Sequence, residues 1–250
     1  MHVGHDGTCR ECQRGLHQMC EKEEALGVTI DGGFAEYVCI RAEAVIRVPK
    51  DMDPAEAAPL MCAGLTTFNS IRKMRIEPGS VVAVQGLGGL GHLAVQFANR
   101  MGFNVVALSS GNSKRDFAKQ LGAHQYIDTS VEDPIKALNT LGGAALIVAT
   151  APEAKVISPL VHGLRSQGKL LVLAPVGNVE FDTTALLRRG LSIHSWPSGT
   201  ILDAEETLAF SKLHKVKCMV EMFPLKDVNK AMNQMLSGAV RFRSVLIMDK

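Results

Sequence analysis

The sequence has no marked excess of either charge sign and no long uninterrupted apolar run. Lys and Arg number 27 against 25 Asp and Glu, which leaves a formal net charge of +2. A balance so close to neutral does not favour binding to nucleic acid or to an anionic membrane surface. Lys, Arg or Asp interrupts every apolar run before it reaches the length that spans a bilayer. The sequence therefore predicts neither a nucleic-acid-binding nor a membrane protein.

The N-terminus also lacks the features of a secreted chain. MHVGHDGTCRECQ contains no apolar core of a signal peptide. Six cysteines in 250 residues are not typical of a disulfide scaffold. With 46% hydrophobic and 21% charged residues, the chain has the composition of a globular protein, large enough for one domain or a domain with an appendage. We expect a cytoplasmic location.

The most informative stretch that is present runs from Val81 to Met101. A β-branched apolar run is followed by glycines, and after them apolar residues recur every three or four positions, as on one face of a helix. This order of strand, glycine turn and helix is the context in which G-x-G-x-x-G predicts a dinucleotide site. The pyrophosphate would lie at the helix N-terminus, although glycine turns also join strands to helices without any ligand. The predicted contact residues are Gly86, Leu87, Gly88, Gly89, Leu90 and Gly91.

Cysteines near the N-terminus give the strongest metal signal. Cys9, Cys12 and Cys20 have the spacing of thiolates that share one tetrahedral zinc ion, but a closed structural site needs four ligands. Asp6, three residues before Cys9, is the candidate for the fourth position, with His5 and His17 as rivals. The alternative is a loop of reduced cysteines without metal.

Alternating short apolar strands and amphipathic helices after residue 80 predict six strands in a doubly wound parallel α/β sheet. Before that region we expect strands over 34–40 and 45–49, and a helix with Asp53 as its N-cap and Pro54 in its first turn. We also expect Cys39 in the core and His92 on the surface at the start of a helix.

Several segments together resemble the zinc-containing medium-chain alcohol dehydrogenases. They are the cysteine lobe (Asp6 to Cys20), DGGFAEYV, AEAAPLMCAGLTTFNSI, VVAVQGLGGLGHLAVQFA, LGAHQYIDT, SWPSGT and FRSVLIM. The resemblance implies a Rossmann domain over 65–198, flanked by a remnant of a GroES-like catalytic domain over 1–64 and its C-terminal return over 199–250. In such enzymes about half of the catalytic domain precedes the cysteine lobe, and we expect that portion to be absent here.

The resemblance also implies roles for residues beside the glycine turn. Cys62 matches one of three protein ligands of the family's catalytic zinc, and Thr66 matches a threonine near the nicotinamide. Because the other two ligands come from upstream segments, we expect Cys62 to be a buried thiol without metal. Arg243 matches an arginine that reaches the pyrophosphate.

Cofactor preference depends on the end of the second Rossmann strand. An acid there would bind the adenosine ribose hydroxyls and exclude a 2′-phosphate, but this chain has Ser109, with Lys114 and Arg115 close behind. We therefore predict NADP(H), with NAD(H) as the alternative, and a solvated helix start as the other interpretation of the two cations. Leu87, Thr150 and Val176 follow strand ends and should line the nicotinamide crevice.

The function predicted from these features is an NADP(H)-preferring oxidoreductase that interconverts small alcohols and aldehydes. It would hold a structural zinc and form a homo-oligomer, as the resemblance implies. The competing hypothesis is a truncated dinucleotide-binding module, catalytically weak or inactive, with a structural or partner role.

Overall fold

The computed structural model describes residues 2–238 and 240–248, and these divide into two compact units. One unit is Ser70–Trp196, and the other is Met1–Asn69 together with Pro197–Lys250. The units divide at 69/70 and 196/197, and the domain boundaries expected from the sequence, at 64/65 and 198/199, stay a prediction. Each unit is described by itself below.

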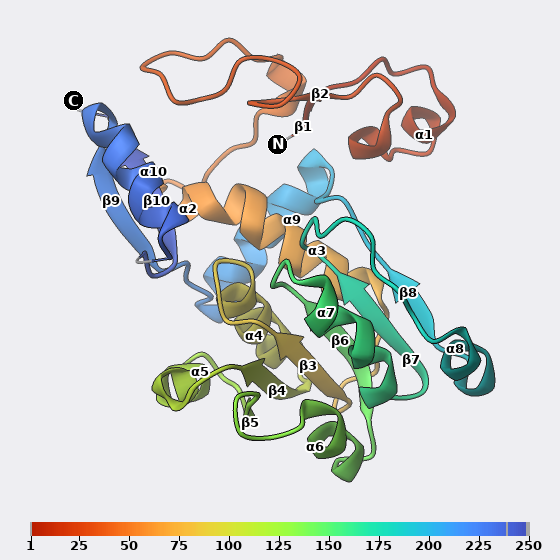
Figure 1. Ribbon diagram of the computed structural model, residues 1–250. Helices are drawn as coiled ribbons and strands as arrows, with labels where there is room; N and C mark the ends of the chain where they lie inside the picture. Colours follow the sequence, from red (N-terminus) through yellow and green to blue (C-terminus); the bar gives the residue numbers. More distant parts are fainter. Residues whose placement is uncertain (1, 239, 249–250) are drawn as a thin grey trace. The chain divides into compact units, whose positions relative to one another are not determined.

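The unit Ser70–Trp196 is built on a six-stranded sheet in which every neighbouring pair of strands is parallel (Figure 1). The strand order is β5-β4-β3-β6-β7-β8. The strands are β3 (Val81–Gln85), β4 (Asn104–Ser109), β5 (Gln125–Asp128), β6 (Ala144–Ala149), β7 (Leu164–Val172) and β8 (Ser192–His194). The predicted doubly wound sheet of six strands is confirmed.

Helices cover both faces of this sheet, so its strands are apolar on both sides. The helices are α4 (Gly91–Arg100), α5 (Arg115–Gln120), α6 (Pro134–Thr140), α7 (Ala154–Ile157) and α8 (Thr183–Arg189), with 3-10 turns at Asn112–Lys114 and Ser158–Gly163. Val82 and Val84 pack in one cluster with Ala94 of α4, whereas Ala83, between them, packs in the other with Leu138 of α6. Successive strand residues point to opposite faces, which explains why the run Val81–Gln85 shows no polar alternation.

Strand order places the predicted cofactor turn where the topology reverses. β3 lies between β4 and β6, so the chain moves outward from β3 first in one direction and then in the other. Crevices beyond the carboxyl ends of strands form at such a switch point. Gly86 follows β3 and Thr150 follows β6 at this point of the sheet.

The other unit contains short helices and two small sheets. β1 (His2–Gly4) pairs antiparallel with β2 (Glu24–Ala25), and β9 (Val220–Pro224) pairs in parallel with β10 (Arg243–Ile247). Its helices are α1 (Arg10–Gln13), α2 (Pro54–Pro59), α9 (Ile201–His214), α10 (Val228–Leu236) and the first part of α3 (Leu65–Lys73); 3-10 turns lie at His17–Met19, Ala42–Ala44 and Leu225–Asp227, and a π-helical turn at Leu60–Gly64.

The predicted helix start at Asp53 is confirmed, because its carboxylate accepts a hydrogen bond from the Ala55 N–H and Pro54 is the first helical residue. The described helices include none with the length and apolar character needed to cross a bilayer.

The strands predicted over 34–40 and 45–49 are wrong. Both segments are irregular, and Phe34 and Tyr37 are 69% and 90% exposed. A strand needs a neighbour for its backbone hydrogen bonds, and no described strand pairs with either segment. Cys39 is likewise exposed rather than in the core.

Candidate functional site

The three motif glycines of the turn after β3 each meet a different steric demand. Gly86 has a φ of 89°, a conformation that L side chains rarely adopt. A Cβ on Gly91 would lie 1.9 Å from the Gly86 carbonyl oxygen, whereas a Cβ on Gly88 would meet nothing within 4 Å. Gly86 and Gly91 are therefore required by the fold, while Gly88 leaves open space at the surface. That open space, next to the start of α4, fits the approach of a pyrophosphate.

Hydrogen bonds from Thr150 hold this turn next to the end of the neighbouring strand, β6. Its Oγ1 donates to the carbonyl oxygens of Gln85 at 2.8 Å and Gly86 at 3.2 Å. The Gln85 carbonyl also accepts from the Thr150 N–H at 2.9 Å, and Gln85 Oε1 accepts from the Ala151 N–H at 3.3 Å. The hydroxyl of Thr150 thus positions the glycine turn, a contact that sequence reasoning missed.

His92 is wrongly predicted as a surface residue, since it is fully buried. Its Nδ1 lies 3.1 Å from the Gly88 carbonyl oxygen, which also accepts the His92 backbone N–H at 3.0 Å. Leu87 is buried as well, in a hydrophobic cluster with Val84 and Leu171. Gly88 is exposed, and Gly89 and Leu90 are half-buried, so these three present the accessible part of the turn.

The loop after β4 is organised by Asp128 and Tyr126. Asp128 Oδ1 accepts from the Gly111 N–H at 2.8 Å, the Ser130 N–H at 3.0 Å and the Ser130 hydroxyl at 2.5 Å. These bonds, the Ser130 hydroxyl first, hold the pKa of Asp128 below its usual value. The Tyr126 hydroxyl donates to the Gly111 carbonyl at 2.5 Å. Ser109, 7% exposed, closes β4 just before this loop.

The two cations predicted near Ser109 differ in their surroundings. The Arg115 guanidinium lies 5.0 Å from the ring centroid of Tyr126 and donates to Asn112 Oδ1 at 2.7 Å and to the Tyr126 carbonyl at 3.3 Å. The guanidinium of Arg115 therefore stabilises the local loop through Asn112 and Tyr126. Lys114 is half-buried at the end of the preceding 3-10 turn.

The cysteine lobe brings together all four predicted ligands. One ligand atom from each of Asp6, Cys9, Cys12 and Cys20 lies within 4.8 Å of the others, the one such cluster of three or more found in the described chain. The Sγ atoms of Cys9 and Cys20 are 3.9 Å apart. Two thiolates on one tetrahedral zinc, with Zn–S distances of about 2.3 Å, stand about 3.8 Å apart. The donor set and its spacing fit zinc, and His5 and His17, the rival candidates, lie outside the cluster.

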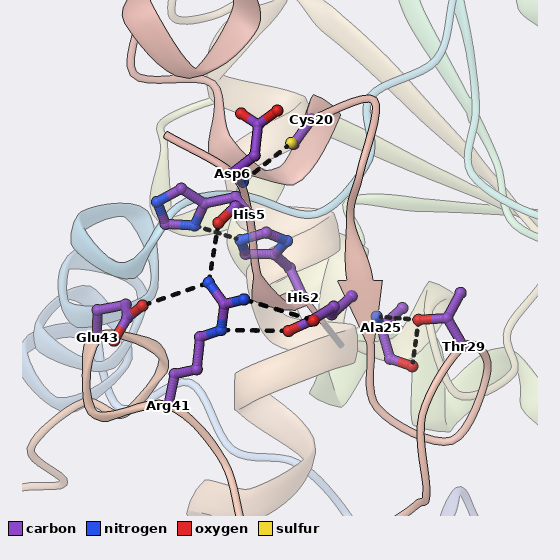
Figure 2. Close-up of polar contacts among 9 residues, drawn as sticks. His2, His5, Asp6, Cys20, Ala25, Thr29, Arg41 and Glu43 are labelled. Atoms are coloured by element: carbon purple, nitrogen blue, oxygen red, sulfur yellow. Dashed lines mark hydrogen bonds and ion pairs between the residues drawn. The ribbon is translucent and has the colours of Figure 1, made fainter. Parts of the chain in front are cut away.

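Backbone groups orient Asp6 for this arrangement. Asp6 Oδ1 accepts from the N–H groups of Thr8 at 2.7 Å and Cys9 at 3.0 Å, and the bond from Cys9 is the main reason that the pKa of Asp6 falls to about 2. The Asp6 N–H in turn donates to Cys20 Sγ at 3.5 Å (Figure 2). Asp6 is thus an anion whose Oδ2 lies 3.7 Å from Lys22 Nζ.

Cys62 is exposed in the π-helical turn before α3, so the expectation that it is buried is wrong. Cys62 and Arg243 line one cavity of about 510 Å³, largely apolar, with residues of α2, α10 and β10. Arg243 Nε is buried and has no hydrogen-bond partner among the described residues. Thr66 is half-buried in the first turn of α3, and Val176, after β7, packs against the second hydrophobic cluster.

Comparison with known proteins identifies the family. Residues 89–213 match the model of zinc-binding dehydrogenases, and residues 1–50 match the GroES-like domain of alcohol dehydrogenases. The chain is 53% identical over 247 residues to the alcohol dehydrogenase patD of Penicillium expansum, covering 99% of this chain and 73% of that protein. The chain belongs to the zinc-containing alcohol dehydrogenase family.

Solved structures of such dehydrogenases share the fold. The alcohol dehydrogenase of the archaeon Aeropyrum pernix superposes with a TM-score of 0.89 at 31% identity, over 97% of this chain and 73% of that one. The acetophenone reductase of Geotrichum candidum, solved in complex with NAD, gives a TM-score of 0.86 at 29% identity, over 98% of this chain and 71% of that one. The matched model of zinc-binding dehydrogenases, the alcohol dehydrogenase relatives and the NAD complex together support an alcohol oxidoreductase that uses zinc and a nicotinamide cofactor.

Cys62, which matches a ligand of the catalytic zinc in the zinc-containing alcohol dehydrogenases, is not part of the cysteine lobe. Cys62 lies outside the one cluster of three or more metal-binding side chains that the described residues contain. A catalytic zinc needs three protein ligands. The described residues alone therefore do not form that site.

Proposed function

We propose that this protein is an NADP(H)-preferring alcohol dehydrogenase that interconverts small alcohols and aldehydes by hydride transfer. The observation that carries the proposal is the turn after β3, where Gly86 and Gly91 are sterically required and Gly88 leaves space for a pyrophosphate. A turn selected only to join strand and helix has no need of a glycine at that open position. When bound, the nicotinamide supplies the hydride chemistry, and the chain binds and orients it.

Within the unit Ser70–Trp196, the residues that would hold the cofactor lie along the carboxyl edge of the sheet. Free N–H groups at the start of α4 would bind the pyrophosphate, and Gly88, Gly89 and Leu90 would border it. Thr150 would act mainly by positioning the turn, with Val176 beside the nicotinamide. Arg243, whose Nε lacks a partner among the described residues, would supply a cation for the pyrophosphate.

Preference for NADP(H) would come from Ser109 and Lys114. Ser109 puts no negative charge at the end of β4, where an acid would repel a 2′-phosphate. Lys114 would provide the compensating cation, whereas the guanidinium of Arg115 is bonded to Asn112 and Tyr126. The carboxylate of Asp128 is already bonded to Gly111 and Ser130, which reduces its effect on a nearby phosphate.

Zinc would have a structural role in the cysteine lobe, held by Asp6, Cys9, Cys12 and Cys20. Burial raises the pKa of the Cys12 thiol to about 12, so a bound cation is what would favour its thiolate. Cys62 and Thr66 would belong to the substrate side. We also propose self-association, with β8, an edge strand of the sheet, as the candidate contact.

The experiment measures cofactor binding, zinc content and turnover separately. We expect a lower dissociation constant for NADPH than for NADH. We also expect one zinc that resists mild chelation, and NADP-dependent oxidation of alcohols. Cofactor binding and one zinc without turnover would instead support the binding-module hypothesis, which the isolated position of Cys62 favours. If neither reduced cofactor changed the melting temperature or fluorescence of the folded protein, both hypotheses would be refuted.

A further inference from the structure

Two imidazole rings outside the cysteine lobe face each other near the N-terminus. His2 Nε2, at the start of β1, lies 3.3 Å from His5 Nδ1, just after β1 (Figure 2). Two imidazole nitrogens on one tetrahedral dication, with metal–nitrogen distances of about 2.0–2.1 Å, stand about 3.3–3.4 Å apart. The pair therefore has the separation that a shared metal ion requires. Without an ion, the two rings share a direct hydrogen bond at this distance.

His2 is oriented from its other side by a carboxylate. His2 Nδ1 lies 3.4 Å from Glu23 Oε1, and the side chain of His2 is only 10% exposed. A proton on Nδ1 directed at Glu23 would leave the lone pair of Nε2 facing His5 Nδ1. Carboxylates bonded to the second ring nitrogen of a histidine are a regular feature of metal sites, where they set the tautomer and the ring orientation.

His5 is held by a different set of contacts. Its ring stacks on that of His17, with centroids 3.9 Å apart and planes 5° from parallel. The His5 carbonyl oxygen accepts a hydrogen bond from Arg41 Nη1 at 2.9 Å (Figure 2). The charge of Arg41 is offset by Glu24, at 3.3 Å, and Glu43, at 3.7 Å. Both imidazoles are thus fixed before any ion arrives, which reduces the ordering cost of binding.

We propose that His2 Nε2 and His5 Nδ1 form a second metal site, which chelates a transition-metal dication such as Zn²⁺ or Ni²⁺. Imidazole nitrogens suit these ions better than Mg²⁺ or Ca²⁺. Water would complete the coordination, because the described residues bring no third ligand to the pair. Glu23 would position His2, and His17 would position His5. The ion would join β1 to the start of the cysteine lobe, independently of cofactor binding.

The test uses untagged protein whose cysteine lobe already holds one zinc, titrated with Ni²⁺ and followed by calorimetry. We expect one further equivalent to bind. His2→Gln and His5→Gln should each remove it, and Glu23→Gln should weaken it about 10–100-fold, as the loss of outer carboxylates does elsewhere. His162→Gln is the matched control, because His162 is a surface imidazole near a carboxylate, 3.8 Å from Asp182, and should leave Ni²⁺ binding unchanged.

Zinc content and melting temperature of each variant show whether the fold and the cysteine lobe survive. If a variant fails to fold, paramagnetic broadening of histidine ring signals by Ni²⁺ in the unaltered protein decides the question. We expect broadening of His2 and His5 first and no effect on His162. Absence of a further equivalent, or binding that persists in both His2→Gln and His5→Gln, would overturn the proposal. Neither result would affect the proposed dehydrogenase function.

Discussion

The carbonyl oxygen of Gly86 occupies the place where any side chain at position 91 would begin. The separation from an ideal Cβ on Gly91 is 1.9 Å, far inside van der Waals contact. Gly86 is itself fixed by its positive φ, its N–H bond to the Leu108 carbonyl at 2.9 Å and the hydroxyl of Thr150. The start of α4 is thereby held against the end of β3, which sets the position of the free N–H groups at the helix N-terminus.

Gly91→Ala should therefore damage both the fold and the proposed cofactor site. The added methyl group must displace the Gly86 carbonyl, and overpacking of this kind costs about 1–3 kcal/mol of stability. We expect NADPH affinity to fall by more than about tenfold, or about 1.4 kcal/mol. Denaturant unfolding and fluorescence titration measure the two effects.

Gly88→Ala separates the same two effects. Its Cβ meets nothing within 4 Å, and its φ is not positive, so the free energy of unfolding should change by no more than about 0.5 kcal/mol. NADPH affinity should still fall by about tenfold, because the methyl group would fill space that the pyrophosphate needs. Unchanged affinity in a stable Gly88→Ala variant would count against a pyrophosphate at this turn.

Ser109→Asp should reverse the proposed cofactor preference. A carboxylate at the end of β4 would accept hydrogen bonds from the ribose hydroxyls of NADH and repel the 2′-phosphate of NADPH. We expect the ratio of the two dissociation constants to change by at least about tenfold. Ser109→Ala, which removes the hydroxyl without adding charge, is the control and should change the ratio much less. An unaltered ratio in Ser109→Asp would place the adenosine elsewhere.

Lys114→Gln and Arg115→Gln should have different effects even though the residues are neighbours. Lys114→Gln should weaken NADPH binding by about tenfold and leave NADH binding and the melting temperature nearly unchanged. Arg115→Gln removes the contact with the Tyr126 ring and the bond to Asn112, so it should lower the melting temperature. If only Arg115→Gln reduced the preference for NADPH, our assignment of the 2′-phosphate to Lys114 would be wrong.

The sheet could be predicted because its signals are local. Short apolar strands, the glycine turn and the helix after it are consistent with one another in propensity, period and turn chemistry. All six predicted strands are present. Asp53 and the cysteine lobe were predictable for the same reason, since their partners are close in sequence.

The wrong predictions concern strand pairing and the burial of single side chains. The segment 34–40 has strand-forming residues, but pairing depends on a partner strand that local sequence does not reveal. His92 was expected at the surface because it is polar and begins a helix. Its Nδ1 reaches the Gly88 carbonyl four residues earlier, a spacing that could have indicated the contact. The hydroxyl of Thr150 bonds to residues more than sixty positions away, and no local signal shows that.

Asp6 can be tested by separating its two roles in the cysteine lobe. Asp6→Asn keeps an oxygen that can accept from the Thr8 and Cys9 N–H groups but removes the negative charge, so the loop should fold and hold zinc less tightly. Asp6→Cys supplies a thiolate and should retain zinc against a chelator longer than the unaltered protein. Zinc release followed with a chromogenic chelator ranks the three proteins. Equal release rates would show that Asp6 is not a ligand.

Cys218 should make the fold sensitive to alkaline pH. Burial raises the pKa of its thiol from 9.0 to about 11, with Arg243 opposing the shift and Glu56 adding to it. Between these two values the unfolded chain has lost the proton that the folded chain keeps, so stability is fully present below pH 9 and falls as pH rises towards 11. The linkage amounts to about 2–3 kcal/mol at most.

Cys218→Ala should lower stability at neutral pH by leaving a small cavity, yet flatten the decline between pH 9 and 11. Urea unfolding across that interval, with Cys39→Ala as the control at an exposed thiol, tests the assignment, and parallel declines in all three proteins would refute it.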